Sequence, residues 1–221
     1  MTARTLVLWS ELAALEALAP SWTALAAELP ASLRVGIETS LRESDRRLRL
    51  LGRLLLARAL ARLGEVGTPE LSFDALGRPH LAGALDPSIS HTDGLACAAV
   101  GVGCRIGVDV ERLQPIEPSL YDRILGPDER RIVTGAKDPD ATFLEFWTMK
   151  EAAAKADGRG LQLDPQRLLC RRGSAFRGAA VRVEAVNYRI RALPLPAGWT
   201  GHLACDAPHG LDVTAEAYSF S

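Results

Sequence analysis

Residues 106–111 (IGVDVE) alternate strictly between branched apolar residues and other residues. Because a β-strand repeats every two residues, this pattern predicts a strand with Ile106, Val108 and Val110 on one face. Asp109 and Glu111 would share the other face with Gly107, their positions about 7 Å apart. Two such carboxylates can bind one hard cation such as Mg²⁺, which takes oxygen ligands. Ordinary solvated acids at a strand end are the alternative.

A helix is predicted over residues 143–157 (FLEFWTMKEAAAKAD), which are rich in helix formers and end before Gly158. On this helix Trp147, Glu151 and Lys155 follow one another at four-residue steps and share one face. A carboxylate and an ammonium one turn apart suit a site that handles phosphate and a proton. An ordinary surface ion pair would give the same spacing.

Two further segments carry polar side chains. Residues 88–92 (SISHT) combine hydroxyls and an imidazole with a turn, a combination that could bind phosphate. An earlier helix is predicted over residues 44–62, with leucines at i, i+3 and i+4 spacing on one face. Its other face carries a stripe of arginines: Arg42, Arg46, Arg49 and Arg53.

Bulk properties exclude several classes of function. The formal net charge of −1 gives no basic field for nucleic acid, and no apolar run approaches the ~18 residues of a membrane span. The first nine residues lack a signal-sequence pattern, and the four cysteines form no CxxC pair. We therefore expect a cytoplasmic protein with reduced thiols, no membrane contact and no nucleic-acid partner.

The length of 221 residues suits one large or two small domains. Residues 114–118 carry two prolines and read as a connection, so we expect two halves, 1–112 and 113–221. Strands are expected at 95–102, 105–111, 180–186, 188–193 and 199–205. The predicted class is α+β, with a helix packed on a small, mostly antiparallel sheet in each half.

Four motifs occur in a fixed order: Gly77-Arg78-Pro79, then Ser88-Ile89-Ser90-His91, then residues 107–111 (GVDVE), then residues 147–161 (WTMKEAAAKADGRGL). In type, order and spacing they resemble the 4′-phosphopantetheinyl transferases of the long, surfactin-synthetase-activating type. The resemblance covers about residues 43–162. The flanking residues fit only in their secondary-structure pattern.

The resemblance implies a monomer of two pseudo-twofold-related halves, with coenzyme A in the cleft between them. It implies transfer of phosphopantetheine from coenzyme A to a serine of an apo acyl, polyketide or peptidyl carrier protein, with release of adenosine 3′,5′-bisphosphate. Asp109, Glu111 and Glu151 would hold Mg²⁺, with Mn²⁺ as the alternative ion. Glu151 would be the catalytic base, directly or through a water, and Lys155 would neutralise or protonate the leaving group.

Carried over by position, the resemblance also implies contacts with coenzyme A. Arg78 stands where many members have lysine and would still bind phosphate. The sequence does not decide which arginine of residues 46–53 points inward. The implied contacts are Arg47, Arg49, Arg53, Arg78, Ser90, His91, Asp109, Lys150 and Lys155.

Two other functions stay open from the sequence. One is a module that binds coenzyme A or a carrier protein without turnover, but no metal acid and no lysine of the pattern is missing. The other is an unrelated magnesium phosphohydrolase that uses Asp109 and Glu111. That function leaves the Gly77-Arg78-Pro79 turn and the serine-histidine motif unexplained.

Overall fold

A computed structural model of the chain describes residues 3–17, 22–37, 42–64, 70–172, 179–207 and 211–220. The chain divides into two compact units, Met1–Cys104 with His209–Ser221, and Arg105–Pro208. Each unit combines helices with a small sheet. The predicted α+β class is confirmed.

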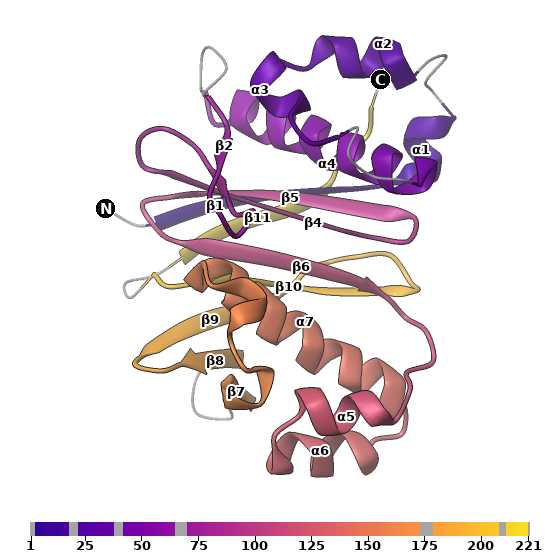
Figure 1. Ribbon diagram of the computed structural model, residues 1–221, viewed down its shortest axis with the longest axis vertical. Coiled ribbons are helices and arrows are strands. Elements are labelled where there is room, and N and C mark those ends of the chain that lie inside the picture. Colours follow the sequence, from indigo (N-terminus) through magenta and orange to yellow (C-terminus); the bar gives the residue numbers. More distant parts are fainter. Residues whose placement is uncertain are drawn as a thin grey trace. The chain divides into compact units, whose positions relative to one another are not determined.

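The first unit is built on a four-stranded sheet in the order β11-β1-β5-β4 (Figure 1). β1 pairs antiparallel with β5 and parallel with β11, and β4 pairs antiparallel with β5. The strands are β1 (Ala3–Glu11), β4 (Leu85–Thr92), β5 (Leu95–Val102) and β11 (Leu211–Ala217). The smaller elements are α1 (Leu12–Glu16), α2 (Trp22–Glu28), α3 (Ala31–Arg34), β2 (Ser72–Phe73) and β3 (Pro79–His80).

One long helix, α4 (Glu43–Arg62), covers this sheet and starts one residue before the predicted position. Leu51 and Leu55 are buried and join the core with Leu8 of β1. Glu43 and Asp45 lie in the first turn of the helix, where negative charge is favourable beside the helix dipole. The apolar stripe read from the sequence is therefore the face that packs.

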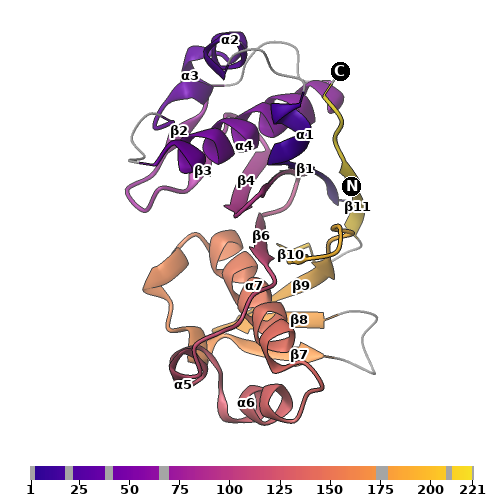
Figure 2. The same cartoon turned by 90° about the vertical axis from the view of Figure 1, so that its right-hand side faces the viewer.

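The second unit is built on a five-stranded antiparallel sheet in the order β6-β10-β9-β8-β7, with α7 lying along it (Figure 2). The strands are β6 (Ile106–Arg112), β7 (Leu169–Arg172), β8 (Ala179–Val183), β9 (Val186–Ala192) and β10 (Trp199–Cys205). The helices are α5 (Ser119–Ile124), α6 (Pro127–Thr134), α7 (Pro139–Asp157) and the short 3₁₀ turns Gly160–Gln162 and Pro165–Arg167.

Helix α7 starts four residues earlier than predicted because its start is capped. The side chain of Asp138 accepts a hydrogen bond from the backbone nitrogen of Ala141, 3.0 Å away, and Pro139 occupies the first turn. At the other end Gly158 has a φ of 99°, a conformation that ends a helix readily only with glycine. The predicted end of the helix at Asp157 is correct.

The division of the chain differs from the predicted boundary at residue 112. β6 pairs along its length with β10 and therefore belongs to the second unit. The chain then returns to the first unit, because β11 pairs with β1. Neither pairing is local in sequence, which is why the two prolines of residues 114–118 gave the wrong boundary.

Among the described residues, none of the helices combines the length and apolarity that crossing a bilayer demands. The cysteines are free thiols, as expected: Cys97, Cys104, Cys170 and Cys205.

Candidate active site

The floor of the candidate site is the face of β6 that packs against α7. At Gly107 the two elements touch so closely that a Cβ atom would lie 2.0 Å from the carbonyl oxygen of Ala152 and 2.5 Å from the backbone nitrogen of Ala156. Only glycine permits such an approach. Because alternate residues of a strand share a face, Asp109 and Glu111 also face α7.

Asp109 and Lys155 form an ion pair on this face. The Nζ atom of Lys155 lies 2.7 Å from Oδ1 of Asp109 and 3.1 Å from the carbonyl oxygen of Val108. The Asp109 side chain is 7% exposed and that of Lys155 is 29% exposed. The pair is therefore largely removed from water, where a charge–charge attraction is stronger than at an open surface. The alternative of a solvated strand-end acid does not hold for Asp109.

The carboxyl of Glu151 is subject to the charges of Asp109, Glu111 and Lys155. Burial raises the pKa of its carboxyl to about 7, and the negative charges of Asp109 and Glu111 add to this effect while Lys155 opposes it. A carboxyl with a pKa near the working pH can take up and release a proton during a reaction. A raised pKa is what the predicted role of Glu151 as a general base requires.

Glu111 completes the group. Its Oε1 accepts a hydrogen bond from the indole Nε1 of Trp147, 3.2 Å away. The predicted helical face of Trp147, Glu151 and Lys155 therefore meets the predicted strand face. The residues predicted to bind metal and to act in catalysis thus all lie in the second unit.

The donor chemistry of this group fits magnesium, because all three predicted ligands are carboxylates. In the described part of the chain, however, no three His, Cys, Asp or Glu side chains converge as metal ligands. Asp109 pairs with Lys155, and Glu111 accepts from Trp147. Metal binding by Asp109, Glu111 and Glu151 stays a prediction.

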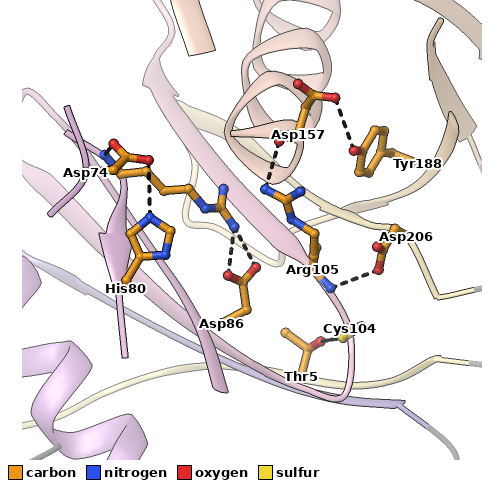
Figure 3. A network of polar contacts seen from close by, with 10 residues as sticks. Thr5, Asp74, His80, Asp86, Cys104, Arg105, Asp157, Tyr188 and Asp206 are labelled. Carbon is orange, nitrogen blue, oxygen red and sulfur yellow. Dashed lines mark hydrogen bonds and ion pairs between the residues drawn. The ribbon is translucent and has the colours of Figure 1, made fainter. Parts of the chain in front are cut away.

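The end of α7 that carries Lys155 is held by a polar network (Figure 3). Arg105 donates to the carbonyl oxygen of Asp157 at 2.8 Å, and the backbone nitrogen of Arg105 donates to Asp206 at the same distance. Arg159 pairs with the Asp157 carboxylate and is the main cause of the lowered pKa of that group. The network fixes the last turn of the helix beside the start of β6.

Lys150 does not fit its predicted contact with coenzyme A. Its side chain is 1% exposed, and its ammonium donates to the carboxylate of Glu129 and to the carbonyl oxygens of Ile124 and Pro165. An ammonium has three donors, and these partners use all of them. Lys150 is a buried structural residue that ties α7 to α6 and the neighbouring turns.

Arg78, in the first unit, is held in place from two sides. The turn before it is closed by Asp74, whose Oδ1 accepts from the backbone nitrogens of Leu76 and Arg78, each at 2.9 Å. His80 also contacts Asp74 at 3.1 Å, and that hydrogen bond is the main cause of the lowered pKa of Asp74 (Figure 3). The guanidinium reaches both carboxylate oxygens of Asp86, at 2.8 and 2.7 Å. Arg78 is thus a buried cation with a fixed direction.

Ser90 and His91 both lie on β4, as the motif requires, but they face opposite sides of the sheet. Ser90 is buried and His91 is exposed. Ile89 packs into the core under α4. Because Ile89 and His91 are two residues apart on the strand, His91 faces the same side of the sheet as that helix. The structure places the two residues next to each other without giving them a common face.

The three arginines of α4 that were predicted to contact coenzyme A have different side-chain partners. Arg47 is paired with Glu16 and Glu43, and Arg49 donates to the carbonyl oxygen of Gly36 at 3.1 Å. Arg53 stacks over the ring of Phe73 at 4.5 Å. Burial, and next the charge of Arg49, lower its pKa to about 10. Its Nη1 atom is buried and has no hydrogen-bond partner among the described residues.

Three residues that contact members of the motifs carried no signal that the sequence analysis used. Glu129 neutralises Lys150, Asp86 neutralises Arg78, and His202 contacts Thr148 at 2.7 Å. Each of these residues lies in a different helix, strand or turn from its partner, and none belongs to a recognisable sequence motif. Only the pairing of elements in the fold reveals them.

Comparisons with known proteins point to one family. Residues 105–188 match the family model described as "4'-phosphopantetheinyl transferase superfamily". The chain is 33% identical over 106 residues to the 4'-phosphopantetheinyl transferase HetI of Nostoc sp., covering 44% of this chain and 45% of that protein. It is 28% identical over 128 residues to the 4'-phosphopantetheinyl transferase Sfp of Bacillus subtilis, covering 55% and 56%.

A third relative is the 4'-phosphopantetheinyl transferase psf-1 of Bacillus pumilus, 27% identical over 123 residues, with 53% of this chain and 52% of that protein covered. A more distant similarity, with a TM-score of 0.39 and 19% identity, is to the crystal structure of the holo-[acyl-carrier-protein] synthase of Thermotoga maritima; it covers 46% of this chain and 62% of that one. The matches span about half the length of the curated relatives. The resemblance to the 4′-phosphopantetheinyl transferase superfamily, predicted from the motifs, is confirmed by these matches.

Proposed function

We propose that this protein transfers 4′-phosphopantetheine from coenzyme A to a serine of an apo carrier protein and releases adenosine 3′,5′-bisphosphate. The observation that carries the proposal is the placement of Glu151. Its carboxyl, with a pKa raised to about 7, lies in the field of Asp109, Glu111 and the Lys155 ammonium. Relatives named as 4′-phosphopantetheinyl transferases support the same activity.

In the proposed reaction Glu151 accepts the proton of the carrier serine, directly or through a water. The serine oxygen forms a new bond to the β-phosphorus of coenzyme A, and the bridging bond to the adenosine 3′,5′-bisphosphate oxygen breaks. Lys155 stabilises or protonates that oxygen as it leaves. Such a reaction needs charge neutralisation and alignment more than covalent help from the protein.

We further propose that the reaction depends on magnesium, held by Asp109, Glu111 and Glu151. When bound there, the ion supplies positive charge against the pyrophosphate. A set of neighbouring carboxylates is the setting in which a cation relieves like-charge repulsion. Burial is the main cause of the raised pKa of Glu151, and repulsion by Asp109 and Glu111 adds to it.

For coenzyme A we propose Arg53 as the main phosphate contact on α4, with Arg49 beside it. Arg47 is the weaker candidate, because two glutamates already neutralise it. Contacts by Arg78, Ser90 and His91 in the first unit, and by Asp109 and Lys155 in the second, stay part of the proposal. A contact by Lys150 is not part of the proposal, because its ammonium is buried and all three of its N–H groups already donate to protein acceptors.

The carrier proteins of fatty-acid, polyketide and nonribosomal-peptide synthesis are all proposed partners. A cytoplasmic setting and a monomeric state stay predictions from the sequence and the family.

A product assay separates the proposal from its two alternatives. The protein is incubated with coenzyme A and Mg²⁺, with or without an apo carrier protein, and adenosine 3′,5′-bisphosphate is quantified by chromatography. A transferase releases it only when the carrier protein is present. A phosphohydrolase releases it in both cases, and a binding module releases it in neither.

A further inference from the structure

A buried hydrogen bond joins α7 to β10 beside the candidate site. The hydroxyl oxygen of Thr148 lies 2.7 Å from Nδ1 of His202. Thr148 has no exposed surface, and His202 is 8% exposed. Both lie in the second unit, and neither was among the residues predicted to act on substrate.

The same hydroxyl lies 2.8 Å from the carbonyl oxygen of Leu144, one turn back, to which it can donate its proton. When it does so, its oxygen accepts from Nδ1 of His202, and the imidazole carries a proton there. In the other tautomer the hydroxyl donates to Nδ1, and the same two atoms stay joined.

The contact lies at a sensitive point of the fold. His202 is directly opposite Asp109 in the register of β10 and β6, so both side chains lie on the α7 face of the sheet. Thr148 precedes Glu151 by three residues and Lys155 by seven, which places all three on one side of the helix. Lys155 reaches Asp109 from that side.

Two of the polar contacts that attach helix α7 to the sheet are those of Thr148 with His202 and of Lys155 with Asp109. They are separated by about 10 Å along the helix axis, from the rise of ~1.5 Å per residue. Glu151 lies between them. A rotation or slide of the helix by even ~1 Å would move its carboxyl away from Asp109, and misplacements of that size can reduce a rate ~100-fold.

We propose that Thr148 and His202 are a positioning pair that fixes Glu151 for proton transfer. The inference rests on the proposed transferase function and adds to it two residues that touch no substrate. If the pair served stability alone, its loss would lower the melting temperature and leave turnover unchanged.

The experiment uses variants that keep or remove the hydrogen bond. Thr148→Ser keeps the hydroxyl, whereas Thr148→Val keeps the shape and loses it. His202→Asn can present an amide N–H close to the position of Nδ1, whereas His202→Gln carries its amide one carbon further out. Val183→Ala, a buried change on β8, controls for loss of stability without loss of the contact.

The kinetic constants kcat and KM for coenzyme A are measured for carrier modification at saturating Mg²⁺, below the melting temperature of every variant. We expect kcat to fall about tenfold in Thr148→Val and in His202→Gln, with KM within about twofold, because only the alignment of Glu151 changes. Thr148→Ser, His202→Asn and Val183→Ala should stay within about threefold. The double variant Thr148→Val/His202→Gln should be no slower than either single one.

If the wild-type protein is active and Thr148→Val has the same kcat, the positioning role is overturned and the transferase function still stands. A kcat in Val183→Ala that falls as far as in Thr148→Val also overturns it, because stability would then explain the loss. Wild-type protein that modifies no carrier overturns the proposed function and the inference together.

Discussion

Lys155 and Asp109, 46 residues apart in the chain, form the ion pair that joins helix α7 to strand β6, with Nζ 2.7 Å from Oδ1. Gly107 permits the contact, because its missing side chain lets α7 approach β6 at Ala152 and Ala156. The close approach also places Glu151 within the field of both strand carboxylates. The site is therefore a direct consequence of how one helix packs on one strand.

Replacement of Lys155 should damage both stability and transfer. Lys155→Met leaves the Asp109 carboxylate nearly buried beside an apolar side chain. We expect the free energy of unfolding, measured by urea denaturation in EDTA, to fall by about 2 kcal/mol. Transfer should fall at least ~100-fold, because the proposed positive charge at the leaving group is lost. Lys137→Met, at an exposed position, is the matched control and should change neither; equal stability of the two variants would contradict the ion pair.

Glu151→Gln should change how stability depends on pH. The pKa of this carboxyl is raised from 4.5 to about 7 in the folded chain, so between these values the folded state binds more protons than the unfolded state. The wild-type protein must then lose stability as the pH rises from about 4.5 to about 7. The shift corresponds to about 3 kcal/mol, reduced to about 2 by partial access of solvent.

Urea denaturation in EDTA at pH 5 and pH 8 measures this effect. Glu151→Gln should gain stability relative to the wild type by about 2 kcal/mol between pH 5 and pH 8. Glu117→Gln, an exposed change, should follow the wild type at both values. Parallel behaviour of Glu151→Gln and Glu117→Gln would show that the Glu151 carboxyl is not perturbed.

Gly107→Ala should force α7 away from β6. The new Cβ atom would meet backbone atoms of the helix, which cannot rotate aside as a side chain can. We expect a loss of about 3 kcal/mol in thermal or chemical unfolding and a large loss of transfer. Gly126→Ala, whose Cβ would find its nearest neighbour at 3.7 Å, should cost less than about 1 kcal/mol. Similar losses in both variants would mean that the packing at Gly107 is not close.

Lys150→Met tests the buried role of this lysine. Removing the ammonium leaves the Glu129 carboxylate buried without its cation, so we expect a loss of about 3–5 kcal/mol. Lys150→Met/Glu129→Gln removes the stranded charge and should recover part of that loss. If Lys150 instead contacted coenzyme A, Lys150→Met would keep its stability and raise the KM for coenzyme A.

The sequence predicted the elements whose pattern is local. The alternation of residues 106–111 placed β6 to within a residue, and the leucine spacing of residues 44–62 did the same for α4. It failed for pairings that join distant segments, such as β1 with β11 and β6 with β10, because no local pattern encodes a strand's partner.

The burial of Lys150 could have been predicted from its position in the sequence. Phe146 precedes it by four residues and Ala153 follows it by three, and both are buried, so Lys150 lies on the apolar stripe of α7. That spacing predicts burial for the lysine stem. Its counter-charge, Glu129, lies on another helix at no characteristic spacing and could be found only from the fold.

The most direct test of the central claim is the intact mass of an apo carrier protein after incubation with this protein, coenzyme A and Mg²⁺. We predict a gain of one phosphopantetheine group, abolished by EDTA and nearly abolished in Glu151→Gln. An unchanged carrier mass across acyl, polyketide and peptidyl carriers, with folded protein that binds coenzyme A, would contradict the transferase function.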